Sequence, residues 1–116
     1  MASGAELLRH IKEQVKEVDP RDVHDIVNNG YDAFAVDVRE QDEFDQGHLP
    51  GARHVPRSYL ETRIENVVKD KDARVILYCQ SGNRSAFAAN TLENELGYTN
   101  VPVSYTHLTL PTICSV

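Results

Sequence analysis

The chain has 116 residues, 41% hydrophobic and 26% charged, which is the size and composition of one globular domain with one core. Its formal net charge is −6 and it has no run of Lys and Arg, so nucleic acid is not an expected partner. No apolar stretch reaches the length of a membrane-spanning helix, so no membrane partner is expected either.

Hydrophobic periodicity and turn residues predict the elements of the first half of the chain. The N-terminal segment 1–14 carries apolar residues at helical spacing and is expected to form an amphipathic helix ahead of the domain. After it we expect, in order, a weak strand at 16–18, a helix that begins after Asp19 and ends before Gly30, a strand at 33–36, and a short acidic helix that ends before Gly47.

The second half continues the alternation of helices and strands. We expect a turn at Pro50-Gly51, a short strand around His54, a helix through 59–68, a strand at 74–78, and a helix through 87–96 that ends at Gly97. The strand at 74–78 is the clearest, because its continuous apolar run fits a central strand covered on both faces. Strands that alternate with helices predict an α/β fold with a parallel sheet.

The segment from Cys79 to Ser85 connects the predicted central strand to the next helix, at the edge of a parallel sheet where ligands bind. Small residues before a helix N-terminus let several backbone N–H groups point at one spot, and the helix dipole adds positive charge. Such donors favour the thiolate, so we predict that Cys79 is a nucleophile. The alternative, a cysteine that is only a small buried hydrophobe, is less favoured because strand, cysteine, glycine-containing loop and helix coincide.

Arg84 breaks a local rule, because a cation in the first turn of a helix opposes the helix dipole. Violations of this kind are expected where function compensates for them. A planar guanidinium that binds an oxyanion would be such a compensation.

The cysteine and histidine content bears on compartment and metal binding. Cys79 and Cys114 are too few for a disulfide framework, and the N-terminus lacks the basic and apolar segments of a signal peptide, so we expect the reducing cytoplasm. His10, His24 and His54 lack metal-ligand spacing with Cys79, so no metal site is expected.

From about Val15 to Val101 the chain resembles the rhodanese family of sulfurtransferases. Three motifs carry the resemblance, in family order: Asp37-Val38-Arg39-Glu40 with Glu43-Phe44, Gly47-His48-Leu49-Pro50-Gly51-Ala52, and Cys79 through Ser85. The resemblance implies a five-stranded parallel sheet flanked by helices, with Cys79 as the catalytic persulfide carrier. It also implies that the substrate-binding cradle consists of Gln80, Ser81, Gly82, Asn83, Arg84 and Ser85.

Three further residues are candidates for the pocket. Asp37 and Arg39 follow a strand and are expected near the site, although Asp37 bonding to loop backbone and Arg39 pairing with an acid such as Glu43 are the preferred interpretations. Arg57 either lines the mouth of the pocket or is an exposed charge. His48 lies within a turn motif and is expected to be structural rather than an acid or base.

The predicted activity is that of a thiosulfate sulfurtransferase. Sulfane sulfur would pass from thiosulfate or a protein persulfide, through a Cys79 persulfide, to a thiol, cyanide or a sulfur-carrier protein, without a metal or organic cofactor. The segment 56–65 also resembles rhodanese domains joined to ubiquitin-activating-type adenylyltransferases, which makes a small sulfur-carrier protein a candidate acceptor.

Two other functions remain as alternatives. A phosphatase or arsenate reductase of related fold has one more loop residue than the four between Cys79 and Arg84, because a tetrahedral oxyanion needs a wider ring of donors. A non-catalytic rhodanese-like interaction module would be expected to lack the nucleophile, and Cys79 is present.

The C-terminal segment departs from the family pattern. Residues 103–112 resemble a translated transposase adapter from a sequencing library, so we expect the rhodanese-like domain to span 15–101 and 102–116 to be a non-native tail. The final strand and terminal helix of the family are then expected to be missing, and Cys114 is not a functional thiol. The alternative is a genuine strand, since Val103, Tyr105 and Thr106 have strand propensity. Even in a non-native tail, residues 101–105 could fill the vacant strand position, because sheet pairing depends more on backbone than on side chains.

Overall fold

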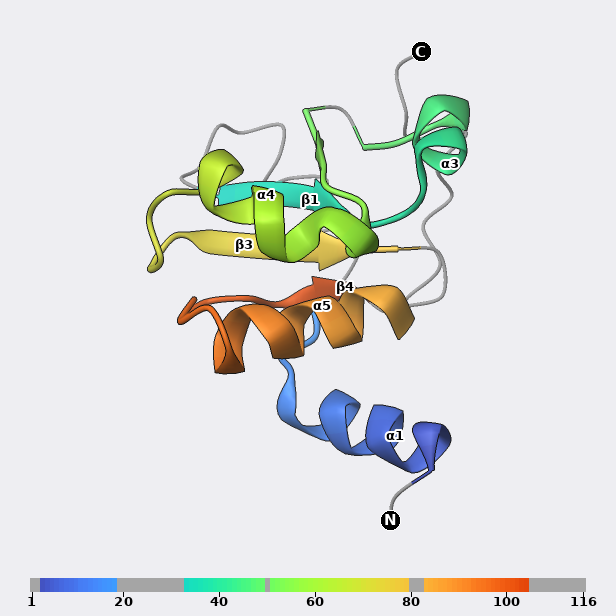
Figure 1. Cartoon of the computed structure of the whole chain (residues 1–116), viewed down its shortest axis with the longest axis vertical. Coiled ribbons are helices and arrows are strands. Elements are labelled where there is room, and N and C mark those ends of the chain that lie inside the picture. Colours follow the sequence, from blue (N-terminus) through green and yellow to red (C-terminus); the bar gives the residue numbers. More distant parts are fainter. Residues whose placement is uncertain (1–2, 19–32, 50, 80–82, 105–116) are drawn as a thin grey trace.

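The computed structural model describes residues 3–18, 33–49, 51–79 and 83–104. The elements, shown in Figure 1, are α1 (Gly4–Gln14), β1 (Ala33–Asp37), α3 (Gln41–Gln46), β2 (Arg53–His54), the 3-10 turn η1 (Arg57–Tyr59), α4 (Leu60–Val67), β3 (Arg74–Tyr78), α5 (Asn83–Asn94) and β4 (Val103–Ser104). Their order confirms the predicted alternation of strands and helices. The helix expected between Asp19 and Gly30 lies outside the described residues.

The strands form one parallel sheet in the order β2-β1-β3-β4. β1 and β3 pair over their whole length, from Ala33 opposite Arg74 to Asp37 opposite Tyr78. The α/β fold with a parallel sheet flanked by helices is therefore confirmed. Where the family resemblance implied a fifth strand, the described residues contain a single bridge between Glu17 and Val103, at the place of the weak strand expected at 16–18.

β4 fills the sheet position that was expected to be vacant. It lies between β3 and the Glu17 segment, and the Val103 backbone is bonded on that side to Lys16 and Val18, each over 2.8 Å. Val103 is fully buried, so its side chain also contributes to the core. The segment that resembles an adapter thus supplies a strand, as β propensity allows; its origin stays a prediction.

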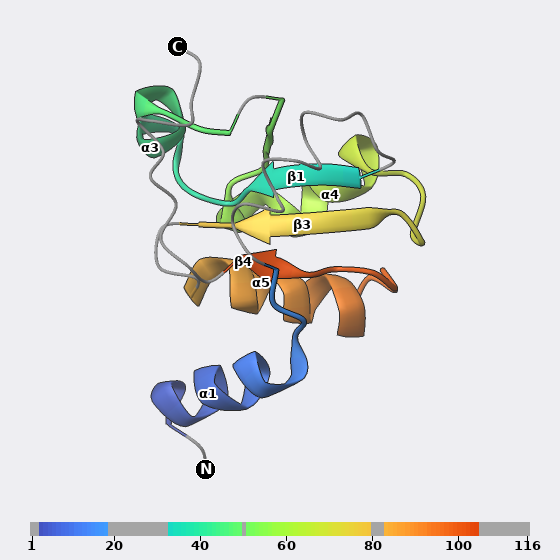
Figure 2. The ribbon, with the colours of Figure 1, turned by 180° about the vertical axis from the view of Figure 1, so that it is seen from behind.

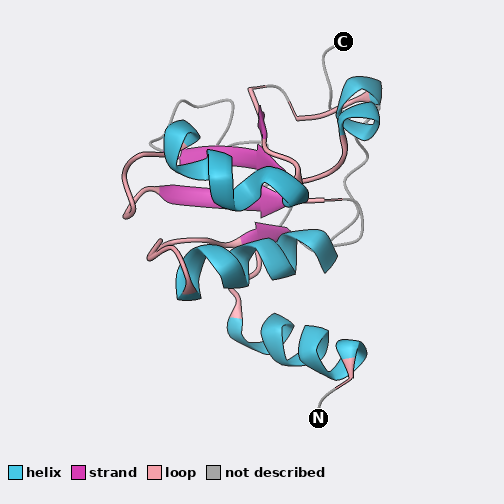
Figure 3. Ribbon diagram, viewed as in Figure 1, coloured by secondary structure: helices cyan, strands magenta, loops and turns pink. Residues whose placement is uncertain are grey.

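The sheet separates two groups of buried side chains. Figures 1 and 2, from opposite sides, show α4 and α5 on one face of the sheet, and Figure 3 shows the same layers by secondary structure. The larger cluster lies on this face and includes Val36, Leu77, Cys79, Leu92 and Val103. Alternate residues of β1 and β3, among them Ala35, Ile76 and Tyr78, form a second cluster with Leu49 and Val18. The unbroken apolar run of β3 is explained by this burial on both faces.

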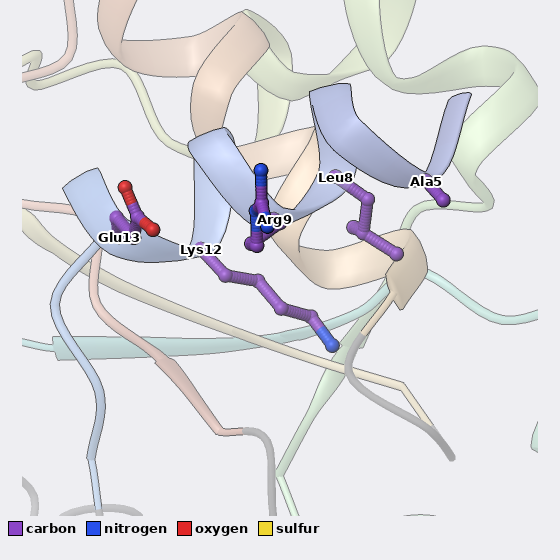
Figure 4. A pocket seen from close by; sticks show the side chains of 5 residues that line it. All are labelled: Ala5, Leu8, Arg9, Lys12 and Glu13. Carbon is purple, nitrogen blue, oxygen red and sulfur yellow. The ribbon is translucent and has the colours of Figure 1, made fainter. Parts of the chain in front are cut away.

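The N-terminal segment forms the expected amphipathic helix. α1 lies beyond the β4 edge of the sheet and contacts α5, with Ile11 as its buried residue, whereas Leu7 remains 47% exposed. Figure 4 shows an open hollow along this helix, lined by Ala5, Leu8, Arg9, Lys12 and Glu13. None of these belongs to the predicted site. In the described part of the chain, no helix combines the length and the apolar character needed to cross a membrane.

Candidate active site

Cys79 follows directly after β3, at the carboxyl edge of the sheet, and only 1% of its surface is exposed. Its sulfur accepts a hydrogen bond from the backbone N–H of Ser85 over 3.4 Å. The thiol lies 3.6 Å from the hydroxyl oxygen of Ser85 and donates to it. A hydroxyl can rotate and donate in return, so both Ser85 groups are placed to stabilise a thiolate.

The first turn of α5 brings these groups to the sulfur. α5 begins at Asn83, so Ser85 is its third residue and its backbone N–H lies in the first helical turn, where N–H groups can bind atoms outside the helix. Ser85 is fully buried, and the next buried residues of the helix, Ala86, Ala88 and Ala89, are small. Small side chains permit close approach of the helix to the sheet, which sets the amide against the sulfur. The position of Cys79 thus depends on both β3 and α5.

Arg84 is held by Glu43 of α3. The two terminal guanidinium nitrogens donate to the two carboxylate oxygens over 2.7 and 2.9 Å, a bidentate ion pair. These bonds are the main reason that the pKa of Glu43 falls to about 2. They also raise the pKa of Arg84, by more than its partial burial lowers it. The sequence suggested that a bound oxyanion compensates for this cation in the first helical turn; in the structure its partner is a carboxylate of the chain itself.

Asp37 and Arg39 form a buried ion pair with each other. Asp37 is fully buried and Arg39 is 5% exposed. The guanidinium donates to both carboxylate oxygens over 2.8 to 3.1 Å, and also to the carbonyl oxygen of Gly47 over 2.6 Å. Asp37 accepts the backbone N–H of Arg39 as well, over 2.9 Å, so it does bond to loop backbone as preferred. Arg39 pairs with Asp37 instead of Glu43, whose carboxylate binds Arg84.

This arrangement of a strand-end cysteine under a helix N-terminus agrees with a family model. Residues 19–106 match the model described as the rhodanese-like domain. The chain belongs to the rhodanese-like domain family. The match extends over most of the chain, and it includes Cys79, Arg84 and the Asp37-Arg39 motif.

Two curated relatives of this rhodanese domain have informative names. The chain is 38% identical over 66 residues to "Thiosulfate sulfurtransferase PspE" of Escherichia coli, covering 57% of this chain and 62% of that protein. It is 32% identical over 71 residues to "Probable adenylyltransferase/sulfurtransferase MoeZ" of Mycobacterium tuberculosis, covering 61% of this chain and 18% of that protein. The chain spans about half the length of other curated relatives that it matches.

A solved structure supports the same family. The rhodanese domain superposes on a structure named thiosulfate sulfurtransferase from Pseudomonas aeruginosa with a TM-score of 0.74 at 27% identity. The superposition covers 82% of this chain and 18% of that chain. The family model shows the family, the superposition supports the fold, and the relatives include named sulfurtransferases.

The remaining predicted site residues are Asn83, the loop residues before it, and Arg57. Asn83 begins α5 next to Arg84, whereas Gln80, Ser81 and Gly82 lie outside the described residues. Arg57 donates to Glu61 over 3.1 and 3.2 Å and to the hydroxyl of Thr91 over 3.2 Å. These contacts place Arg57 as a link between η1, α4 and α5. Among the predicted site residues that the structure describes, Ser85 contacts the Cys79 sulfur directly.

Two features of the rhodanese domain were not predicted as parts of the site. The first is Glu43, which was considered as a partner of Arg39 and proves to bind Arg84. The second is a stack in which the Phe44 ring lies between His48 and His54, with centroid distances of 3.7 and 4.4 Å. His48 donates to the Phe44 carbonyl oxygen and His54 to that of Arg39, each over 2.8 Å, so His48 has the structural contacts expected of it. The adjacent Glu43-Phe44 pair in the sequence was the available signal for both features.

Among the described residues, no group of three His, Cys, Asp or Glu side chains is placed to hold a metal ion. The described groups at this edge of the sheet are a buried thiol, the backbone donor of Ser85 and an arginine paired with a carboxylate.

Proposed function

We propose that this rhodanese domain is a sulfurtransferase that carries sulfur as a persulfide on Cys79. The observation that carries the proposal is the position of the Cys79 sulfur at the end of the central strand, with the Ser85 backbone N–H directed at it over 3.4 Å. A thiolate at that place is stabilised by the helix N-terminus, and the positive end of the helix dipole also favours the negative charge on the outer sulfur of a persulfide. The sulfurtransferase relatives support the same class of reaction.

In the proposed reaction the Cys79 thiolate attacks the sulfane sulfur of thiosulfate or of a persulfide donor. An S–S bond forms on Cys79, the S–S bond of the donor breaks, and sulfite or a thiolate leaves with the bonding electron pair. Cyanide or an acceptor thiolate then attacks the outer sulfur and removes it, and Cys79 leaves as a thiolate. The cycle consumes no external oxidant or reductant and requires no metal or organic cofactor.

The proposed acceptor in the cell is a thiol or a small sulfur-carrier protein. The similarity to a protein named as a combined adenylyltransferase and sulfurtransferase supports a carrier, because such a pairing joins activation of an acceptor with delivery of sulfur. The proposed compartment is the cytoplasm, where the persulfide cycle has a reduced cysteine available. Nucleic acid and membrane lipid have no part in the proposal.

A phosphatase is disfavoured by the ion pair at Arg84. A guanidinium that binds Glu43 through both terminal nitrogens is not presented to a phosphate group. The loop of four residues between Cys79 and Arg84 also gives fewer backbone donors than a tetrahedral oxyanion needs.

The proposal is tested by thiocyanate formation from thiosulfate and cyanide. Cys79→Ser is expected to lose all turnover, because serine cannot form the persulfide. The chain offers a matched control in its second cysteine, and Cys114→Ser is expected to keep the wild-type rate. Turnover that survives in Cys79→Ser, or that disappears in Cys114→Ser, would rule out Cys79 as the sulfur carrier. Hydrolysis of a phosphate ester, measured on the same preparation, is expected to be negligible.

A further inference from the structure

Besides the ion pair with Arg84, two sets of contacts hold Glu43 in place. Its carboxylate oxygen Oε1 accepts the backbone N–H of Glu40 over 3.1 Å, and Glu40 caps the same helix in return, which completes a capping box on α3. The buried Asp37–Arg39 pair, which also bonds Gly47 at the other end of α3, secures the helix to the end of β1. Glu43 is therefore a rigidly held carboxylate and not a mobile surface acid.

The ion pair with Glu43 neutralises the positive charge of Arg84. Both terminal nitrogens are directed at Glu43, so the guanidinium is oriented toward α3, and the ion pair has no net charge. The two side chains are only partly exposed, which limits the exchange of this pairing for water. Arg84 follows Asn83 and precedes Ser85 in α5, so this neutralised cation stands one residue from the amide that binds the Cys79 sulfur.

The charge of a sulfur donor should therefore matter at this site. Thiosulfate brings two negative charges and releases sulfite, also a dianion, when its S–S bond breaks. A small persulfide such as 2-hydroxyethyl persulfide brings one negative charge, on the sulfane sulfur, and releases a thiolate. A free guanidinium beside the thiol would favour the dianion, because the attraction between opposite charges increases with the charge of the ligand. A guanidinium that is already paired gives little such advantage.

We propose that Glu43 determines the donor specificity of Cys79: by holding Arg84 in an ion pair, it disfavours dianionic donors such as thiosulfate and favours persulfides that carry a single negative charge. This inference rests on the proposed persulfide chemistry of Cys79. Both donors leave the same Cys79 persulfide and differ only in the leaving group, so a comparison between them isolates the loading step. Glu43 acts here through Arg84 and is a positioning residue.

The test compares kcat/KM for thiosulfate and for 2-hydroxyethyl persulfide, with cyanide as the common acceptor. In Glu43→Gln the ratio of thiosulfate to persulfide is expected to rise roughly tenfold, the factor that corresponds to about 1.4 kcal/mol for one gained charge contact. Inorganic phosphate should become a stronger competitive inhibitor in the same variant. The matched control is Glu61→Gln, which breaks the pair in which one guanidinium nitrogen of Arg57 binds both carboxylate oxygens, and its ratio should stay at the wild-type value.

A double variant shows whether the effect passes through Arg84. In Glu43→Gln combined with Arg84→Gln, the gain for thiosulfate should disappear, because no cation remains to be released. An unchanged ratio in folded Glu43→Gln would overturn the inference, and so would a gain that persists in the double variant.

If Glu43→Gln does not fold, the wild type decides between the outcomes. A kcat/KM for thiosulfate above that for the persulfide contradicts the inference, and the reverse order supports it. Failure of both donors to load wild-type Cys79 would instead refute the proposed function.

Discussion

The backbone N–H of Ser85 donates a hydrogen bond to the sulfur of Cys79 over 3.4 Å, across a loop that separates the two residues by six positions. The contact joins the end of the central strand to the first turn of α5. It requires the helix to lie close to the sheet, which the small residues on the buried face of α5 permit. The geometry of the proposed site is thus a property of the core packing as much as of the loop.

The hydroxyl of Ser85 is expected to contribute to persulfide formation beyond the backbone contact. Ser85→Ala keeps the amide but removes the hydroxyl 3.6 Å from the sulfur. Loss of one hydrogen bond of about 1 kcal/mol predicts that loading with thiosulfate slows roughly fivefold. Single-turnover release of sulfite measures this rate directly. A rate equal to that of the wild type would show that the backbone N–H alone suffices.

The Asp37–Arg39 pair is expected to be essential for stability. Asp37→Asn leaves the buried Arg39 without its charge partner, and breaking a buried pair in this way costs about 3–5 kcal/mol. That is a large part of the roughly 5–15 kcal/mol that stabilises an ordinary domain. Urea unfolding measures the loss. Glu61→Gln, in an exposed pair, should cost no more than about 1 kcal/mol, and equal losses in the two variants would refute the distinction.

Glu43 also makes the stability of the fold depend on pH. Its pKa is lowered from 4.5 to about 2, first by the hydrogen bonds from Arg84, so the folded state binds the proton less well than the unfolded state. The stabilisation is therefore complete above about pH 4.5 and is lost as the pH falls toward about 2. The difference in unfolding free energy between wild type and Glu43→Gln should shrink over that interval. A difference that stays constant from neutral pH down to pH 2 would contradict the assignment.

Ser104 is a site where a substitution should stabilise the protein. Its hydroxyl is fully buried in β4 and has no hydrogen-bond partner among the residues that the structure describes. Burial of an unpaired polar group costs about 1–3 kcal/mol, so Ser104→Ala is expected to raise the unfolding free energy by about 1 kcal/mol. A matched control is Thr99→Val, which removes a hydroxyl bonded to Asp72 over 2.8 Å and should destabilise. Loss of stability in Ser104→Ala would show that the hydroxyl has a stabilising role.

Local patterns were sufficient to predict much of the fold. The run Val75-Ile76-Leu77 identifies the central strand because full burial on both faces requires apolar side chains throughout, and the cysteine that follows is then placed at the edge of the sheet. The single β-bridge between Glu17 and Val103 was harder to predict, because one bridge imposes little pattern on the sequence. A strand at 103–104 was foreseen only as one of two alternatives, since sheet pairing depends more on backbone than on side chains.

The partners of the charged residues could not be predicted in the same way. Arg84 and Glu43 are 41 positions apart, and the two side chains meet because α3 and the first turn of α5 lie next to each other in the fold. Arg39 had both Asp37 and Glu43 within reach along the sequence, and the choice between them depends on which acid Arg84 occupies. The unfavourable position of Arg84 in its helix did indicate that a negative group was required. The position of Arg84 alone could not show whether that negative group is a bound oxyanion or a carboxylate of the chain.

The central claim is that Cys79 holds the transferred sulfur, and intact mass spectrometry of the whole chain tests it most directly. After treatment with thiosulfate and removal of excess donor, the wild type and Cys114→Ser should each gain the mass of one sulfur atom and lose it again on addition of cyanide. Cys79→Ser should show no gain. A sulfur adduct on Cys79→Ser, or a folded wild type that takes up no sulfur from thiosulfate or from a persulfide, would contradict the account.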